Sequence, residues 1–383
     1  MVVACQALIH KTMHLHLVSF NIPYPPNYGG VIDVFFKVKA LQLAGVKVHL
    51  HCFDYGREKS EELSKLCADV HYYPRRLSIL KQLKKIPFIV ATRSNQELID
   101  NLNRDEHPIL LEGLHCTYPL LKNLQESRKI IVRAHNIEHE YYQGLARTEK
   151  NILKKAYFKV EALKLKTYEP ILRKASAIAS ISQSDKDYFS AINPNTELVL
   201  PFHPFNEVAV KPGKGKYILI HGDLSVPENI QSTLWLIENV ISRCPHPFVI
   251  AGKNPPECIR TSASKNRNVK LIPNPNDTTL TELIENAQLN IVHSIFPQGF
   301  KLKLLHVLYR GRWCICNHNV IKNTGLEPLC IIANSSNEYT PVINELMEKA
   351  FEVGPIEKRV KVLKQFSNQI QANKLIGMFN DPT

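Results

Sequence analysis

Short apolar runs alternate with helix-like segments along the whole chain, and this alternation limits the fold more than any other feature. Such a chain forms parallel sheets with helices on both faces. The predicted fold class is therefore α/β, with two Rossmann-like doubly wound domains that face a central cleft. The first half has predicted strands at 13–20, 46–54, 68–74, 175–182 and 196–202, and strand-then-polar units at 107–116 and 129–142. The second half has predicted strands at 216–224, 247–253, 269–274, 289–294, 313–317 and 329–335.

The alternation is interrupted at 203–216, where prolines and glycines without periodicity indicate a linker. A chain of 383 residues is long enough for two domains with separate cores. Met13 begins the first predicted strand, so we expect it to be the natural start. The expected division is an extension at 1–12, a first domain at 13–205, a second at 206–345, and C-terminal helices at 346–383 that pack back across the domains.

The segment after the strand at 289–294 combines features of a phosphate site. Gly299 precedes a helix whose leucines fall on one face, and Gly311 ends it. Lys301 and Lys303 lie at the start of this helix, where the positive helix dipole disfavours cations. Lysines at such a position are useful if an anion binds above them. A glycine loop, free backbone N–H groups and two lysines together predict a phosphate cradle.

The first strand leads into a similar glycine-rich turn. The loop NIPYPPNYGG ends at Gly29 and Gly30, and an amphipathic helix stopped by Gly45 follows. Paired glycines allow the backbone to approach a ligand closely and direct N–H groups toward it. Their place after the first strand is where open parallel sheets bind ligands.

Two histidines are expected at the carboxyl ends of neighbouring strands. His115 follows the strand at 107–116 and His135 follows the next one. Ligand clefts lie at these strand ends, so the two imidazoles are predicted to face one crevice. Arg133, Asn136 and Glu138 add polar groups beside His135 that could orient a sugar.

Two helix predictions concern the segments around these sites. A long helix is expected at 148–174, where lysines alternate with apolar residues. The helix after the strand at 216–224 is expected to start with a capping box between Ser225 and Glu228.

Asp185 and Asp187 match a metal-binding DxD pattern, but acids are expected in a first helical turn from the dipole alone. No metal site is therefore predicted.

The net charge of +13 indicates an anionic partner, which could be a substrate, a membrane surface or a nucleic acid. No basic patch is interleaved with aromatic residues in a known module, so nucleic acid is not expected. The segment 75–90 carries five basic residues between leucines and could lie on an anionic membrane or simply cover a sheet edge. The nine scattered cysteines, without a CxxC, favour a protein of the reducing cytoplasm. If the segment 75–90 binds a membrane, that membrane would be the inner face of the cell membrane.

The blocks PYPPNYGG, RAHNIEHEYY, ASISQSDKDYF, HGDLSVPENIQSTLWLIENV and GFKLKLLHVLYRG resemble bacterial members of glycosyltransferase family 4 and related GT-B enzymes. The resemblance covers nearly all of 13–372. It implies metal-independent transfer of a sugar, with retention, from a nucleotide-diphosphate donor held by the second domain to a glycan or lipid-linked acceptor held by the first. The product would belong to a surface polysaccharide or glycoconjugate. No cofactor is implied.

The resemblance also implies roles for individual residues. His135 and Lys303 would be catalytic, while His115, Arg133, Asn136 and Glu138 would lie on the acceptor side. Donor contacts would come from Gly29, Gly30, Gly222, Lys253, Ile272, Asn274, Gly299, Phe300, Lys301, Lys303 and His306.

One departure from the family pattern leaves alternatives open. The family commonly has a glutamate seven residues after the glycine, where it binds ribose hydroxyls, and here that residue is His306. A second frequent glutamate is replaced by the stretch Pro297-Gln298. A neutral histidine accepts only one hydrogen bond. The chain could thus be a degenerate homologue that binds sugar nucleotides, or an epimerase in which Glu138 and His115 act on one nucleotide sugar.

Overall fold

The computed structural model describes residues 12–122, 124, 128–297 and 299–380. Its strands form two sheets in which every neighbouring pair is parallel. Both are doubly wound, because the chain moves outward from a central strand and then returns to its other side. The predicted α/β class with two Rossmann-like domains is confirmed. Residues 1–11 of the expected extension lie outside the described residues.

The first sheet has the order β3-β2-β1-β4-β5-β6-β7. Its central strands are buried along their whole length, since helices cover both faces. Its strands are β1 (His14–Ser19), β2 (Lys47–Asp54), β3 (Asp69–Pro74), β4 (Ile109–Glu112), β5 (Ile130–Ala134), β6 (Ala177–Ser180) and β7 (Thr196–Leu198). Its helices are α1 (Gly29–Leu43), α2 (Glu61–Leu66), α3 (Phe88–Ala91), α4 (Gln96–Leu102), α5 (Glu138–Thr148), α6 (Ile152–Tyr168) and α7 (Gln183–Ser190).

The second sheet has the order β10-β9-β8-β11-β12-β13. Its strands are β8 (Ile218–Asp223), β9 (Phe248–Lys253), β10 (Val269–Pro273), β11 (Leu289–Val292), β12 (Trp313–Cys316) and β13 (Ile331–Ile332). Its helices are α8 (Pro227–Asn239), α9 (Glu257–Ser264), α10 (Asp277–Asn286), α11 (Leu302–Arg310), α12 (His318–Ile321) and α13 (Ser336–Glu348). The helix predicted between Gly299 and Gly311 is therefore present as α11.

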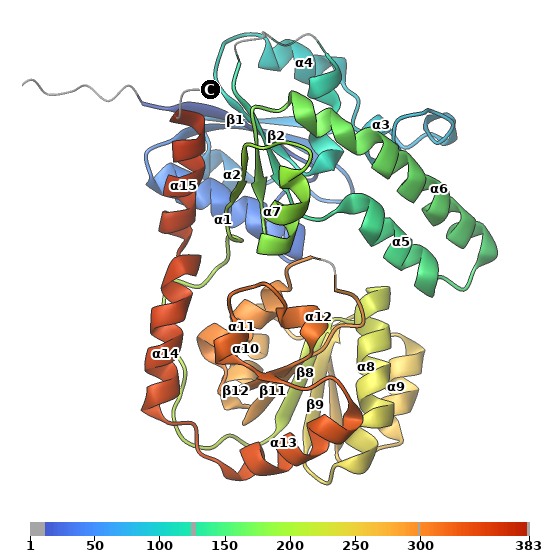
Figure 1. Ribbon diagram of the computed structural model, residues 1–383, viewed down its shortest axis with the longest axis vertical. Coiled ribbons are helices and arrows are strands. Elements are labelled where there is room, and N and C mark those ends of the chain that lie inside the picture. Colours follow the sequence, from blue (N-terminus) through green and yellow to red (C-terminus); the bar gives the residue numbers. More distant parts are fainter. Residues whose placement is uncertain (1–11, 123, 125–127, 298, 381–383) are drawn as a thin grey trace, which may run out of the picture.

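The end of the chain connects the two sheets. Helix α14 (Val353–Leu363) packs with the second sheet, and α15 (Asn368–Asn380) lies against α1 on the first (Figure 1). Ala372 and Leu375 are buried in the core of the first sheet. The side chain of Gln371 accepts a hydrogen bond from the backbone N–H of Leu200 at 2.8 Å. The last helix is thus a structural part of the first half of the molecule.

The long helix predicted at 148–174 is present as α6 over a shorter range. It begins only at Ile152, because Asn151 caps it by accepting hydrogen bonds from the N–H groups of Leu153 and Lys154 at 3.0 and 3.1 Å. From Glu169 the chain continues as a 3-10 turn, η4 (Glu169–Lys174). The polar residues at the end of the unit predicted at 129–142 begin α5, a helix that was not predicted. The basic segment 75–90 contains only a 3-10 turn, η1 (Ile79–Lys81), and the start of α3, whose N-cap is Pro87.

The loops that follow the strands of the two sheets meet each other (Figure 1). The ammonium of Lys253, at the end of β9, donates to the carbonyl of Asn27 at 3.0 Å. The amide of Asn323 donates to the hydroxyl of Ser184 at 3.0 Å. Since Asn27 precedes α1 and Ser184 lies at the start of α7, the carboxyl edges of both sheets face the same interdomain region.

Candidate functional site

The amino ends of α11 and α8 converge on the second-domain side of this region. Lys301, the N-cap of α11, places its ammonium 2.6 Å from Glu228 Oε1 in the first turn of α8. The ammonium of Lys303 donates to the side-chain oxygen of Asn229 at 3.1 Å. Two half-buried lysines therefore lie between two helix N-termini. This arrangement concentrates positive charge and N–H donors in one place, which suits a phosphate group.

Glu228 was misjudged from the sequence. The predicted capping box with Ser225 is absent, because the hydroxyl of Ser225 bonds to Asp223 and the helix starts after Val226 without a side-chain cap. Glu228 instead accepts hydrogen bonds from the Ser294 hydroxyl and from Lys301. Its carboxylate is therefore a counter-ion for the lysines. No local pattern predicts this contact, since its partners come more than sixty residues later.

The pKa of Lys303 is lowered to about 8, first by burial and then by the neighbouring charge of Lys301, with Glu228 acting in the opposite direction. An ammonium with such a pKa is charged at neutral pH but loses its proton within the range of ordinary buffers. A bound anion would stabilise the charged form.

A buried network of charges lies beneath the first-domain side. The Lys37 ammonium is 2.9 Å from Asp33 Oδ2 and 2.6 Å from Glu112 Oε1, and all three side chains are at most 1% exposed. Glu112 also contacts His135, whose Nε2 is 2.8 Å from Oε2. The carboxylates thus fix the ring of His135 at the end of β5 from below.

Arg133 does not lie on an acceptor surface, in contrast to the sequence prediction. Its guanidinium is fully buried, contacts Asp33 at 3.1 Å, and donates to the backbone carbonyls of Ser180, Val199 and Leu200. A side chain with its donors already satisfied inside the fold cannot bind a sugar without breaking that network. Arg133 holds β5, β6 and α1 together instead.

Burial alone would raise the pKa of Asp33, but Arg133 and Lys37 outweigh it and hold this pKa well below its ordinary value. Burial acts on Glu112 in the same way, and Lys37 and His135 lower its pKa below the usual value. Both carboxyl groups are therefore ionised at neutral pH. Together they balance the lysine and the arginine.

His115, Asn136 and Glu138 do lie close together, as the sequence predicted. The Nδ1 atom of His115 is 3.8 Å from Glu138 Oε1, and Asn136 bonds to the same carboxyl group. Burial raises the pKa of Glu138 to about 7, although Asn136 and Arg93 oppose that change. Burial lowers the pKa of His115 well below its ordinary value. A carboxyl group that titrates near neutrality beside a neutral imidazole is suited to proton transfer.

The two sides also approach each other at Gly299. A Cβ on this residue would lie 2.5 Å from the Oδ1 atom of Asn136, and its backbone has a φ of +72°. Gly30 is also restricted, because a Cβ there would lie 2.7 Å from the ring of Phe20, whereas Gly29 faces open space. Of these glycines, Gly299 therefore lies directly against the opposite domain, at Asn136.

The remaining predicted donor residues differ in their surroundings. Gly222 lies beside Asn229, with ordinary contact distance for an added Cβ, and Asn274 has a φ of 50° and accepts a hydrogen bond from the Asn254 N–H. Ile272 packs partly in a small apolar cluster. Phe300 points toward the core instead of the cleft, since its ring centroid is 6.0 Å from that of Phe366.

His306 is turned away from the lysines by its own contacts. Its Nε2 atom is 3.3 Å from the Thr281 hydroxyl, and its ring lies 4.8 Å from that of Phe205. Burial and the charge of Arg310 lower its pKa to about 4, so the ring is neutral at pH 7. Gln298, the other departure from the family pattern, lies outside the described residues.

Asp33, Glu112 and His135 are spaced closely enough to be metal ligands, with atoms within 4.8 Å of one another. The ammonium of Lys37 already lies between the two carboxylates. A divalent cation would have to displace a buried charge that is held by two ion pairs. The donor set is thus better matched to lysine than to a metal.

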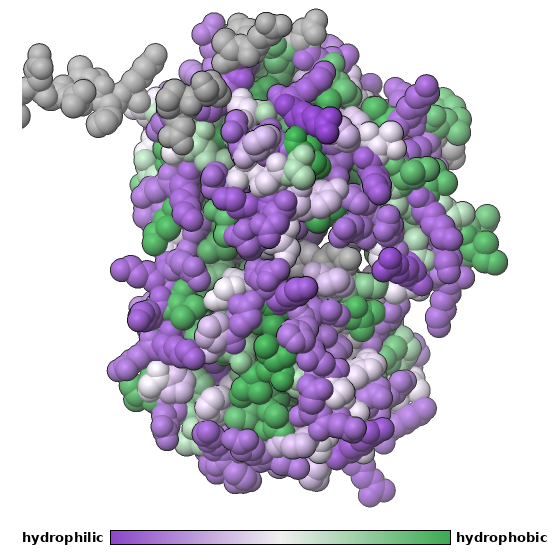
Figure 2. Space-filling view, in the orientation of Figure 1, coloured by the Kyte–Doolittle hydropathy of each residue, from purple (hydrophilic) through white to green (hydrophobic). Residues whose placement is uncertain are grey.

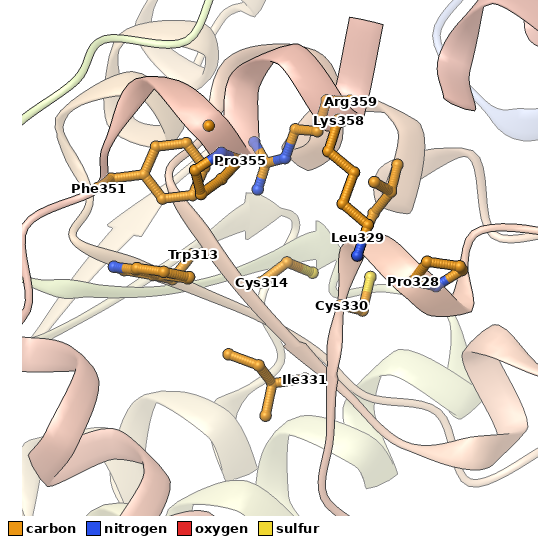
Figure 3. A pocket seen from close by; sticks show the side chains of 11 residues that line it. Trp313, Cys314, Pro328, Leu329, Cys330, Ile331, Phe351, Pro355, Lys358 and Arg359 are labelled. Atoms are coloured by element: carbon orange, nitrogen blue, oxygen red, sulfur yellow. The ribbon is translucent and has the colours of Figure 1, made fainter. Parts of the chain in front are cut away.

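A pocket of about 250 Å³ lies elsewhere, at the outer edge of the second sheet (Figure 3). Its walls come from β12, β13 and α14, and its lining includes Trp313, Cys314, Cys330, Phe351 and Arg359. It contains none of the residues predicted as site residues. Because Lys301, Lys303, Asn136 and Gly299 lie where the two domains meet, we place the candidate site between the domains.

Comparisons with known proteins agree with this architecture. No family model matches the chain. A curated protein of Klebsiella pneumoniae, described as an uncharacterized 44.6 kDa protein in the cps region, is 27% identical over 397 residues, which cover 93% of this chain and 99% of that protein.

Solved structures show the same fold. TarM superposes with a TM-score of 0.66 at 11% identity, covering 97% of this chain and 99% of its own. A glycosyltransferase from Rickettsia africae gives 0.64 at 14% identity, covering 97% and 98%. The trehalose-6-phosphate synthase OtsA gives 0.64 at 10% identity, covering 97% and 99%. The two Rossmann-like domains are thus arranged as in GT-B glycosyltransferases.

Proposed function

We propose that this protein is a glycosyltransferase that moves a hexosyl group from a nucleoside-diphosphate sugar to a glycan or lipid-linked acceptor. The observation that carries the proposal is the position of α11. Its N-terminus, with Lys301 and Lys303, faces the loop after β5 at the contact between Gly299 and Asn136. The predicted phosphate cradle on one domain thereby opposes the polar side chains of His135 and Asn136 on the other.

The chemistry of the leaving group explains why this arrangement is useful. Negative charge grows on the diphosphate as its bond to the sugar breaks, and fixed cations and helix N-termini stabilise that charge. Lys301 and Lys303 supply the cations, and α11 and α8 supply the N–H groups. Two such lysines can do this without a metal ion, so we propose metal-independent transfer. Glu228 would release Lys301 when the diphosphate binds.

On the other side of the cleft, His135 is the candidate contact to the transferred sugar. Its ring is held in place by Glu112 at 2.8 Å, which fixes its orientation before any ligand arrives. We also propose that transfer proceeds with retention, as the resemblance of the sequence to glycosyltransferase family 4 implies. The fold neighbours include sugar transferases, and the relative from a cps region favours a role in surface polysaccharide synthesis.

A nucleotide-sugar epimerase is the second candidate. One observation favours it, namely that Glu138, with its pKa near 7, lies 3.8 Å from the neutral His115. An epimerase needs such an acid and base around the sugar of a single substrate. It would convert the nucleotide sugar with no acceptor present, whereas a transferase would leave the sugar unchanged.

A thermal-shift panel tests the proposal first. UDP, GDP, ADP and CMP, and the corresponding sugars, are added without metal and then with magnesium. A ligand at one hundred times its Kd stabilises the folded state by about 2.7 kcal/mol. We expect one diphosphate to raise the melting temperature equally with and without magnesium.

Two lysine variants make this test specific. Lys303→Ala should abolish the shift, while Lys265→Ala, at the exposed position that directly follows α9, should preserve it. Turnover of Lys303→Ala should fall by about 10²–10³. No shift with any nucleotide would contradict the proposed donor site. A shift without turnover would instead support a degenerate homologue, with His306 as the first residue to replace by glutamate.

We further propose that the protein works in the cytoplasm at the inner membrane face. None of the described helices is long and apolar enough to cross a membrane. Leu77, Leu80 and Leu83 are exposed within the basic segment 75–90, and apolar residues near the start of α6 are exposed on the same side of the molecule (Figure 2). Anionic liposomes at low salt should therefore sediment the protein. Equal sedimentation of a Leu80→Ser/Leu83→Ser variant would contradict this contact.

A further inference from the structure

A row of histidines crosses the first sheet on one face. The sequences HLH in β1 and HLH in β2 place alternate histidines on the same side of two paired strands. The pairing register sets His16 opposite His49, so His14 and His49 lie diagonally across the strands. His107 enters the same face just before β4. Three imidazoles from segments far apart in the chain are thereby brought together.

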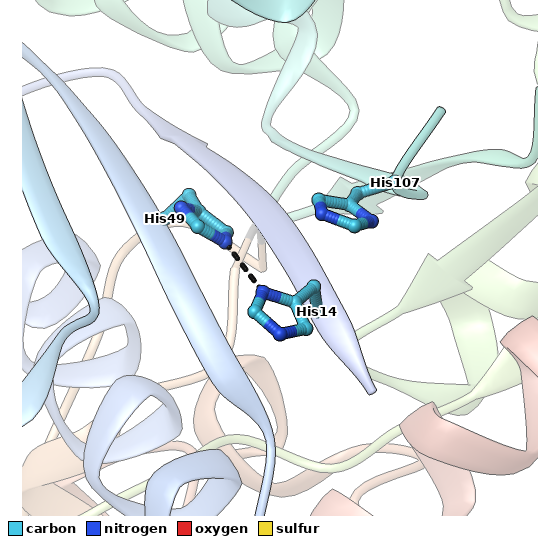
Figure 4. A group of neighbouring side chains, drawn as sticks. All are labelled: His14, His49 and His107. Atoms are coloured by element: carbon cyan, nitrogen blue, oxygen red, sulfur yellow. Dashed lines mark hydrogen bonds between the residues drawn. The ribbon is translucent and has the colours of Figure 1, made fainter. Parts of the chain in front are cut away.

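The three rings are close enough to share one ligand (Figure 4). The Nδ1 atom of His14 is 2.9 Å from Nε2 of His49, and the ring centroid of His107 is 4.7 Å from that of His14. One nitrogen of each ring lies within 4.8 Å of the others. All three side chains are half-buried, so an ion from solution can reach them.

Asp69 adds a feature typical of a metal site. Its Oδ2 atom is 2.6 Å from Nδ1 of His49. A carboxylate at this position accepts the Nδ1–H and leaves the Nε2 lone pair of His49 directed toward His14. Histidine ligands of metals almost always have such a partner, which fixes the tautomer and the ring orientation.

We propose that His14, His49 and His107 bind a divalent transition-metal ion of the zinc class. Zn²⁺ binds imidazole nitrogens at about 2.0–2.1 Å in tetrahedral geometry, which separates two ligand nitrogens by roughly 3.3 Å. The His14–His49 pair needs to open by only a few tenths of an ångström, and His107 needs to move inward. Water would complete the fourth position. Imidazole ligands favour zinc, copper or nickel over magnesium or calcium.

This site is separate from the proposed transfer site. His14 begins β1 and His107 precedes β4, so the cluster lies at the amino edge of the sheet. The glycines, His135 and the lysines lie at or face the carboxyl edge. A metal here would cross-link β1, β2 and the segment before β4. It would stabilise the first domain without taking part in donor binding, so the inference does not depend on the proposed function.

The test is metal binding by the full chain, without a polyhistidine tag and after treatment with chelator. We expect calorimetry with Zn²⁺ to give one strong site per chain, and Zn²⁺ to raise the melting temperature. Co²⁺ should give the intense visible absorption of a tetrahedral site. Weak binding of several ions, with no rise in melting temperature, would overturn the proposal.

Variants distinguish this site from adventitious binding to the other histidines. His107→Ala should weaken Zn²⁺ binding at least tenfold, and it should fold normally, because the described contacts of this side chain are ring stacking. Asp69→Asn should weaken Zn²⁺ binding by about 10–100-fold, because it removes the carboxylate that orients the ring of His49. His318→Ala, an exposed histidine of the second domain, should bind as the unaltered chain does. Equal binding by the His107→Ala variant would disprove the site.

Discussion

The Oδ1 atom of Asn136 lies 2.5 Å from the position that a Cβ on Gly299 would occupy. The two residues belong to different domains, since Asn136 follows β5 of the first sheet and Gly299 lies between β11 and α11 of the second. Their contact shows how closely the backbone of the predicted phosphate loop approaches the opposite domain. Together with the φ of +72° at Gly299, it explains why glycine is required at this position.

Gly299→Ala should therefore weaken nucleotide binding by about tenfold, because a left-handed backbone conformation costs a non-glycine residue roughly 1–2 kcal/mol. The loop would relax to avoid this strain and would move the N–H groups of α11. Titration of the nucleotide identified by thermal shift measures the effect. In a Gly299→Ala/Asn136→Gly double variant the clash is removed but the strain remains, so affinity should recover only in part. Unchanged affinity of the single variant would show that the loop does not hold the ligand.

Much of the fold could be predicted because periodicity is a local signal. The strands around His14, Lys47 and Leu289 were expected within a few residues of their observed bounds. Helix α5 was missed because its first turn is polar and continues directly from the loop after β5. The start of α6 at Ile152 was placed four residues too early, because the side-chain cap at Asn151 also fits an exposed position within a helix.

The grouping of residues in the candidate site could be predicted where glycines and lysines are adjacent in sequence, and contacts were missed where the partners are distant. Lys301 and Lys303 follow Gly299 closely, so their grouping was visible. The contact of Lys301 with Glu228 and that of Lys37 with Glu112 join separate elements, which no local pattern reveals. Arg133 was assigned to the cleft because its position at a strand end could not show that Asp33 and three carbonyl groups enclose it.

The affinity for a nucleoside diphosphate should fall as the pH rises above about 8, the pKa of Lys303 in the free protein. Burial lowers this pKa, so the ammonium is present below pH 8 and is progressively lost above it. One required proton implies a loss of about tenfold between pH 7 and pH 9. Calorimetric titrations at several pH values above 7, where the phosphates are already ionised, measure this slope.

Lys303→Arg is the matched control for that experiment, because a guanidinium keeps its charge throughout the range. Its affinity should be almost independent of pH, whatever its absolute value. If the variant shows the same slope as the unaltered protein, another group titrates and Lys303 is not the cation that binds the diphosphate.

Glu138→Gln should stabilise the protein at pH 8 and have little effect at pH 4. Burial raises the pKa of Glu138 to about 7 in the folded state, above its value of 4.5 in the unfolded chain. Such a group favours folding below pH 4.5, and this contribution is lost as the pH rises through 7. The shift corresponds to at most about 3 kcal/mol. Urea unfolding at the two pH values tests the sign, and an equal effect at both would exclude the raised pKa.

Lys37→Met should destabilise the protein at pH 7 by about 3–5 kcal/mol, the usual cost of removing one member of a buried ion pair. The Lys37 ammonium is 2.6 Å from Glu112 and 2.9 Å from Asp33. Without it, two buried carboxylates would face each other, with Arg133 and His135 as charged partners and the Phe202 N–H as a further donor to Asp33. Lys39→Met on the same helix is the control, since Lys39 is exposed and its loss should change stability little.

The pH dependence of the Lys37→Met effect identifies its cause. The pKa values of Asp33 and Glu112 are lowered in the folded protein, because the nearby cations outweigh burial. The stability that they contribute is present above the pKa of an unfolded carboxyl group and is lost as the pH falls. Without Lys37 the pKa values of these two carboxyl groups are higher in the folded variant, so they become neutral there as the pH falls. The difference in stability between Lys37→Met and the unaltered protein should thus narrow as the pH falls. Glu112→Gln in the Lys37→Met background should recover part of the loss at pH 7. A loss that is independent of pH and unaffected by Glu112→Gln would instead reflect lost packing of the lysine side chain.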